Sequence, residues 1–228
     1  MLVLALDTTT RAGSCAVARG GVVLREHPGD EQRPHDARLP SDVMTLLDHA
    51  NVPLESIDVY AVATGPGSFT GLRIGIATMQ GLAFAAGKPL IGVSAFDALA
   101  QIAMPTDAII ATWIDAWRGD VYAARYHEGR ELEAPTVERP EALLARYREA
   151  RRPHVFIGDG AEVYRTVIET VGELAHLAEP AAPPLAGAMA RLATGAARAG
   201  RLPPPHAIRP LYVRRPDAEI ARDARPVR

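Results

Sequence analysis

The sequence contains a single cysteine, Cys15, and a single lysine, Lys88. One cysteine excludes a disulfide framework and a Cys-x-x-Cys site, which is typical of a reducing compartment. Met1 runs directly into an apolar stretch without a basic leader, and no apolar run reaches the roughly 20 residues that a membrane span requires. We therefore expect a cytoplasmic protein with no membrane partner.

The sequence also lacks a recognisable catalytic or metal-binding motif. No two of the seven histidines lie three to five residues apart, so no helix or turn presents a pair of metal ligands. Four possible nucleophiles, Cys15, Ser68, Thr70 and Ser94, have no nearby His-acid arrangement. We predict no metal site and no catalytic residue.

Charge of one sign does not dominate either. The 25 basic and 27 acidic residues leave a net charge of −2, which excludes a general basic surface for nucleic acid. Residues 208–228 differ, because they contain six arginines and three acidic residues and so carry a net charge of +3. Such a tail is usually solvated, and contact with RNA is the alternative.

Two similar halves are present. Strands are predicted at 2–6, 14–19, 22–26, 57–64 and 90–93, with helices at 36–50, 71–86 and 95–103. The second half begins again with strands at 108–114, 120–127 and 132–137, a helix at 141–149, a strand at 155–157 and helices at 161–171 and 185–199. This order predicts an α/β fold of two ribonuclease H-like lobes, each a mixed sheet flanked by helices. The expected units are 1–104, 105–207 and a basic tail at 208–228.

The helix at 71–86 is unusual, because it carries no charge from Ile74 to Ala86. A helix that is apolar all round must be covered on both sides. One side can pack on its own sheet, and the other is open to a partner or to a second element of the same domain. The residues that we expect on the partner side are Gly71, Ile74, Gly75, Thr78, Leu82 and Ala85.

Polar turns end strands at matching places in the two halves. In a two-lobed fold such turns face each other across a cleft, where N–H groups and hydroxyls can hold phosphate and carboxylates can hold Mg²⁺ through water. The alternative is that Asp, Thr and Gly simply make good turns. The candidate nucleotide-binding residues are Asp7, Thr8, Thr9, Thr10, Asp115, Arg118, Gly158 and Gly160.

Several stretches together resemble one family. The glycine-rich segment Gly-Pro-Gly-Ser-Phe-Thr-Gly-Leu-Arg-Ile-Gly at 65–75 is similar to the signature of the bacterial TsaB family, also called YeaZ. Further matches are Leu-Ala-Leu-Asp-Thr-Thr-Thr at 4–10, Lys-Pro-Leu-Ile-Gly-Val-Ser at 88–94, Ile-Asp-Ala-Trp-Arg-Gly-Asp-Val-Tyr at 114–122 and Pro-Leu-Tyr-Val-Arg at 210–214. Residues 128–200 match weakly.

The resemblance implies an actin/Hsp70-like ATPase fold and a role in forming N6-threonylcarbamoyladenosine at position 37 of tRNAs that read codons starting with A. The family member is a non-catalytic scaffold that pairs with the catalytic paralogue TsaD through its two N-terminal helices, and the ATPase TsaE joins them. Isolated chains are expected to form a homodimer. No cofactor is expected to bind firmly, and ATP or ADP with magnesium at the interface of the complex is the ligand to test. On the helix at 36–50, the implied contact residues are Leu39, Val43, Leu46 and Leu47.

Two departures from the family pattern matter. Catalytic relatives carry a His-x-x-x-His metal motif where this chain reads Ser94-Ala95-Phe96-Asp97-Ala98, so the transferase metal is not expected. Trp117 replaces the arginine of an Asp-Ala-Arg turn, which puts any ligand contact of that side chain in question. The alternative functions are an autonomous M22-type peptidase-like hydrolase and a stand-alone ATPase that uses Asp7 and Asp115.

Overall fold

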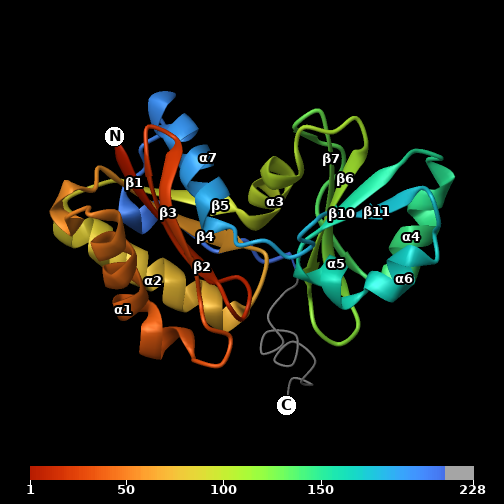
Figure 1. The fold of residues 1–228 in the computed structure, drawn as a ribbon, viewed down its shortest axis with the longest axis horizontal. Coiled ribbons are helices and arrows are strands. Elements are labelled where there is room, and N and C mark those ends of the chain that lie inside the picture. Colours follow the sequence, from red (N-terminus) through yellow and green to blue (C-terminus); the bar gives the residue numbers. More distant parts are fainter. Residues whose placement is uncertain (214–228) are drawn as a thin grey trace, which may run out of the picture.

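The computed structural model describes residues 1–213, which form two lobes, each built on its own sheet (Figure 1). Most of the predicted basic tail, residues 214–228, lies outside the described residues.

The first lobe is a five-stranded sheet in the order β3-β2-β1-β4-β5. Strands β1 and β2 and strands β2 and β3 pair antiparallel, whereas β4 runs parallel to β1 and β5 parallel to β4. Its elements are β1 (Leu2–Asp7), β2 (Ser14–Arg19), β3 (Val22–Pro28), α1 (His35–Ala50), a 3₁₀ turn η1 (Leu54–Ser56), β4 (Val59–Gly65), α2 (Phe69–Ala86), β5 (Leu90–Ser94) and α3 (Ala95–Ala103).

Alternation along β1 divides the core of this lobe into two layers. Leu4 and Leu6 pack in a cluster with the inward residues of α1 and α2. Val3 and Ala5 point to the opposite face, where they pack with α7 (Ala186–Arg198). The first sheet is therefore covered on both faces, which explains why its central strands are almost continuously apolar.

The second lobe repeats this topology with the order β11-β10-β6-β7-β8, and β9 also pairs with β7. β6 and β7 are antiparallel, and β10 and β11 continue the sheet in parallel with β6. Its elements are β6 (Ile109–Asp115), β7 (Val121–His127), β8 (Arg130–Glu131), β9 (Thr136–Glu138), α4 (Pro140–Glu149), β10 (His154–Ile157), α5 (Asp159–Val163), α6 (Arg165–Glu169) and β11 (Ala175–Leu177). The predicted α/β fold with two related lobes is confirmed.

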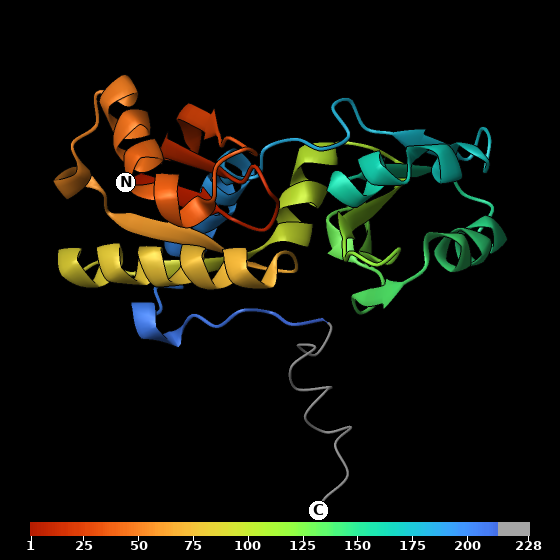
Figure 2. The ribbon, with the colours of Figure 1, turned by 90° about the horizontal axis from the view of Figure 1, so that it is seen from below.

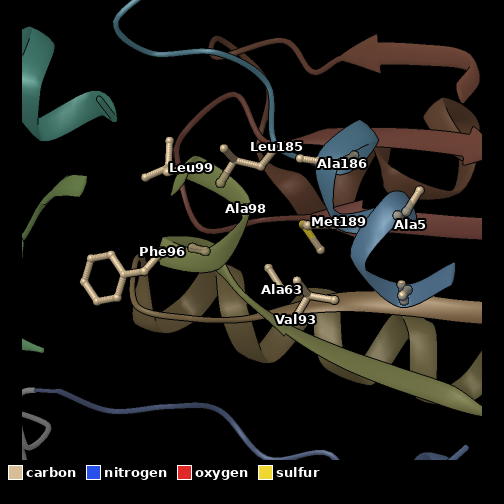
Figure 3. Packing of buried hydrophobic residues seen from close by; sticks show 14 of the residues in the cluster. Ala5, Ala63, Val93, Phe96, Ala98, Leu99, Leu185, Ala186 and Met189 are labelled. Carbon is tan, nitrogen blue, oxygen red and sulfur yellow. The ribbon is translucent and has the colours of Figure 1, made fainter. Parts of the chain in front are cut away.

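The chain then returns to the first lobe, which corrects the expected second unit of 105–207. Helix α7 packs on β1, β2 and β3 and beside α3, so its apolar stripe is buried against the first sheet. Figure 3 shows part of this cluster, with Leu99 of α3 near Leu185 and with Met189 of α7 above Val93. After α7, a segment with a 3₁₀ turn η2 (Pro205–Ala207) runs along α2 (Figure 2), where Gln80 Nε2 donates to the carbonyl oxygens of Pro205 at 2.9 Å and Ile208 at 3.3 Å.

Two local predictions in the second half are wrong, and one strand was missed. The strand expected at 132–137 is two short strands, β8 and β9, with residues 132–135 between them. The helix expected at 161–171 is interrupted at Tyr164, whose φ of −104° and ψ of 22° are not helical, so α5 and α6 are separate. Strand β11 was not predicted, because three residues provide too little alternation to recognise.

Glycines let α2 approach the first turn of the sheet closely. A Cβ on Gly75 would lie 2.2 Å from Thr8 Oγ1 and 3.2 Å from Thr8 Cβ, and one on Gly71 would lie 2.2 Å from the Thr8 carbonyl oxygen. Rotation of the Thr8 side chain can move Oγ1 away, but Thr8 Cβ, at 3.2 Å, stays closer than an ordinary van der Waals contact. Gly81 in the same helix has nothing within 4 Å of its Cβ position.

We predict that Gly75→Ala lowers the free energy of unfolding by about 1–3 kcal/mol, because the added methyl group overpacks the contact with Thr8. Gly81→Ala, the matched control, should raise it by up to about 1 kcal/mol through helix propensity alone. Urea unfolding followed by circular dichroism measures both values. Equal effects of the two substitutions would contradict the assigned contact.

Candidate functional site

A cavity of about 840 Å³ lies between the two lobes. The first lobe contributes the β1–β2 turn, the β3–α1 loop and Ser68 ahead of α2, and the second lobe contributes the ends of β6 and β10. Leu99 and Leu185, which pack in the cluster between the lobes, form an apolar part of the wall. The cavity is therefore shaped by strand ends, as ligand clefts of α/β folds commonly are.

The β1–β2 turn brings a buried carboxylate to this cavity. Asp7 ends β1 and is 2% exposed, and its Oδ1 accepts hydrogen bonds from Thr9 N at 2.9 Å and Thr9 Oγ1 at 2.7 Å. Burial raises the pKa of Asp7, and the hydrogen bonds from Thr9 oppose that rise. Thr10 Oγ1 accepts from Gly13 N at 3.1 Å, which closes the turn.

The second lobe places two further carboxylates on the same cavity. Asp115 ends β6, and its Oδ1 accepts from Trp117 N at 3.0 Å. Asp159 Oδ1 accepts from Asp115 N at 3.1 Å and from Gly160 N at 2.9 Å. Burial, reinforced by the nearby charge of Asp115, raises the pKa of Asp159 to about 6. No group of three or more His, Cys, Asp or Glu side chains in residues 1–213 has the geometry of a metal site.

The β3–α1 loop closes the cavity on the side of the first lobe and is held by Arg38, which is 1% exposed. The guanidinium of Arg38 donates to the carbonyl oxygens of Ala12 and Arg33 and pairs with Asp42. His35 Nε2 lies 3.0 Å from the Thr10 carbonyl oxygen, and burial lowers the pKa of His35. These contacts tie the loop to the β1–β2 turn.

Most of the predicted nucleotide residues gather here. Asp7, Thr9, Thr10, Asp115 and Gly158 line the cavity. The other three were expected at the site and do not line it: Thr8 is buried against α2, Gly160 backs onto Ile114 and Asp115, and Arg118 is exposed nearby.

Sequence reasoning missed several lining residues. Asp159 could have been predicted, because it is an acidic residue that directly follows a strand, in the Gly-Asp-Gly turn. His35, Ser68 and Val163 carried no signal, because only the packing of the lobes brings them to the cavity.

A second candidate surface is the outward face of α1 and α2, and the predicted residues require correction there. Leu39, Val43, Leu46 and Leu47 are at most 3% exposed and belong to the core of their own lobe, because the apolar stripe of α1 faces the sheet. The space beside Gly71 and Gly75 is filled by Thr8. In this chain these six residues are not available to a partner.

The exposed side of α2 carries no charged residue after Arg73, whereas the exposed residues of α1 include Asp36, Asp48 and His49. Ile74, Thr78 and Leu82 are half-buried and Ala85 is exposed, so the partner contact expected of these four residues stays a prediction. Each of the two helices also exposes a large apolar side chain that the sequence did not single out: Phe84 on α2 is 83% exposed and Met44 on α1 is 47% exposed. We call the exposed side of α2 formed by Ala77, Gly81, Phe84 and Ala85 the Phe84 face. No helix in the described part of the chain is long and apolar enough to cross a membrane.

We predict that Asp159→Asn changes how stability depends on pH. Above the ordinary pKa of 3.8 the unfolded chain releases the Asp159 proton, whereas the folded chain keeps it until about pH 6. The free energy of unfolding of the native chain should therefore fall as pH rises from 4 to 6, by at most about 3 kcal/mol from this group. The amide oxygen can keep both hydrogen bonds, so the variant should lack this decline.

Urea unfolding of both chains at pH 4, 5, 6 and 7 measures the difference. Asp7 is present in both chains, so its contribution to the pH dependence of stability cancels in the difference. Parallel curves would show that Asp159 titrates normally.

Comparison with known proteins identifies relatives over most of the chain. The family model described as TsaD, tRNA N6-adenosine threonylcarbamoyltransferase, matches residues 6–222. A protein from Escherichia coli (strain K12) is 36% identical over 72% of this chain and 74% of its own length. A protein from Bacillus subtilis (strain 168) is 30% identical over 75% of this chain and 76% of its own length. Both are named tRNA threonylcarbamoyladenosine biosynthesis protein TsaB.

A solved structure agrees with these sequence matches. The crystal structure of a Pseudomonas aeruginosa protein, described as similar to the peptidase YeaZ, superposes with a TM-score of 0.78 at 34% identity. The superposition covers 93% of this chain and 99% of that chain. With its sequence relatives and its closely similar fold, this chain belongs to the TsaB family, also called YeaZ.

Proposed function

We propose that this chain is a non-catalytic subunit of the machinery that forms N6-threonylcarbamoyladenosine at position 37 of tRNAs reading codons that start with A. The observation that carries the proposal is its similarity, across about three quarters of the chain, to two proteins named for threonylcarbamoyladenosine biosynthesis. The match to the TsaD family model supports a paralogous relationship with the transferase.

The positions of the metal motif in catalytic relatives support a non-catalytic role. Ser94 here caps α3, with its Oγ accepting from Asp97 N at 3.5 Å. Ala98 is 0% exposed and packs in the cluster between the lobes (Figure 3). An imidazole at position 98 would overfill this cluster, so core packing accounts for Ala98 and helix capping accounts for Ser94 without a metal.

The Phe84 face supports a role in assembly. An exposed phenylalanine next to small residues is costly to leave in water, and burying it contributes about 1.5–3 kcal/mol. We propose that a TsaD-type partner covers this face, that TsaE joins the pair and that tRNA is the substrate of the complex. In the isolated chain a second copy takes the partner's place.

We also propose that ATP or ADP with Mg²⁺ is a weakly held ligand of the cleft. The cavity of about 840 Å³ has the size of a small-molecule site. Asp7 and Asp115 would hold Mg²⁺ through water, and Arg11 and Arg33 on the same cavity are suited to phosphate oxygens. Bound magnesium would neutralise part of the nucleotide's negative charge beside three carboxylates.

We predict that omitting this chain from purified TsaD-type partner, TsaE, tRNA, ATP and the threonylcarbamoyl donor lowers the rate of adenosine modification by at least tenfold. The reason is that the partner then lacks its scaffold. Mass spectrometry of nucleosides measures the product. An unchanged rate would refute the proposal, and chelator-sensitive peptide hydrolysis by the chain alone would favour the hydrolase instead.

We predict that Phe84→Asp weakens binding to the TsaD-type partner by at least thirtyfold, because it places a charge in an apolar contact. The side chain is 83% exposed, so the variant should fold normally. Val22→Asp is the matched control, since Val22 is 68% exposed at the β2–β3 turn and lies outside the Phe84 face. Sedimentation velocity with each variant measures association, and equal affinity of the two variants would place the interface elsewhere.

A further inference from the structure

A large aromatic side chain stands at the cavity between the lobes without being buried. Trp117 follows Asp115 in the β6–β7 turn, lines the cavity and is 55% exposed. The other tryptophan, Trp113, lies in β6 and is 0% exposed in the core of the second lobe. An indole ring is among the most costly apolar groups to leave in water, so a ring held beside a cavity points to a ligand.

The backbone fixes Trp117 in an uncommon conformation. Trp117 and Arg118 both have φ of 59°, a left-handed region that bulky residues seldom adopt. The hydrogen bonds that hold the turn include Trp117 N to Asp115 Oδ1 at 3.0 Å, Asp120 N to the Trp117 carbonyl oxygen at 3.2 Å, and Ala116 N to the Asp120 carbonyl oxygen at 3.0 Å. Because the first bond joins the turn to a carboxylate of the cleft, the position of the ring is coupled to that carboxylate. Strain of this kind gathers at ligand sites.

A second exposed apolar residue lines the same cavity. Val163 is the last residue of α5 and is 59% exposed. It comes four residues after Asp159, so both elements of the second lobe that carry a carboxylate to the cavity also carry an apolar side chain to it. The cavity therefore combines apolar groups for a planar ring with carboxylates suited to a hydrated cation.

The two lobes offer different chemistry to one ligand. The arginines that line the cavity, Arg11 and Arg33, come from loops of the first lobe, whereas Trp117 and Val163 come from the second. A molecule with an anionic end and a flat aromatic end matches this division. Inorganic phosphate would contact only the two arginines, and an apolar ligand would contact only Trp117 and Val163.

We propose that Trp117 stacks on the purine ring of a magnesium-bound nucleoside di- or triphosphate in the cleft, with Val163 packing beside the same ring. This rests on the proposed nucleotide ligand and adds the residue that recognises its base. Stacking of a base on an aromatic side chain is sequence-tolerant, because every base has a π-face. Trp117 should therefore contribute affinity for ADP and GDP alike.

The test compares ligands with and without a base. Isothermal titration calorimetry should show that Trp117→Leu weakens Mg-ADP by about tenfold or more, whereas Trp117→Phe keeps most of the affinity because it can still stack. Magnesium tripolyphosphate, which lacks a base, should bind the native chain and both variants equally. Val22→Ala, outside both the cleft and the Phe84 face, is the control for general effects of removing an exposed apolar group.

A second readout follows the ring itself. In Trp113→Phe the only tryptophan left is Trp117, and Mg-ADP should quench its fluorescence while tripolyphosphate does not. If this core variant fails to fold, the calorimetry of the native chain and the Trp117 variants decides alone.

Equal binding of Mg-ADP to the native chain and Trp117→Leu would overturn the stacking role and leave the nucleotide site standing. Absence of any Mg-ADP binding to the native chain would overturn both, without touching the proposed role in tRNA modification. Quenching by tRNA but not by Mg-ADP would also overturn the proposal, and would assign the ring to RNA instead.

Discussion

The packing of α3 between α7 of the first lobe and strands β6 and β10 of the second is the contact on which the remaining structure depends. Leu99 of α3 and Leu185 just ahead of α7 belong to one cluster that also contains Ile114 and Ile157 of the second lobe. This cluster joins the two sheets and sets the distance between the strand ends that carry Asp7 and Asp115. Without it the polar turns would be separate loops, because neither lobe encloses the cavity alone.

The same packing explains the electrostatics of the cleft. Ser14 Oγ accepts from Leu185 N at 3.2 Å and from Ala186 N at 3.0 Å, which anchors the start of α7 beside the first turn of the sheet. Burial is the main cause of the raised pKa of both Asp7 and Asp159. A cation ligand would offset this cost, since it favours the ionised carboxylates.

The two candidate surfaces have opposite relations to the core. In the cleft, hydrophobic packing brings polar groups together from distant parts of the chain. In α2, the side with Gly71 and Gly75 packs against Thr8 and the sheet. The opposite side, which carries the Phe84 face, is left uncovered. Assembly with a partner and binding of a nucleotide would therefore use different parts of the first lobe, joined by the turn that contains Thr8 and Thr9.

The sequence alone determined the order of the elements, the duplicated architecture and the acidic turns at Asp7 and Asp115, because alternation, helical spacing and turn chemistry are local. It also showed that α2 is apolar all round, but not which side faces inward. Only the tertiary structure decided that Leu39, Val43, Leu46 and Leu47 are core residues, that α7 covers the first sheet, and that Asp159, Val163 and Trp117 share one cavity. The physical reason is that a periodic pattern records how much surface must be buried, whereas the partner that buries it is set by contacts between residues far apart in the chain.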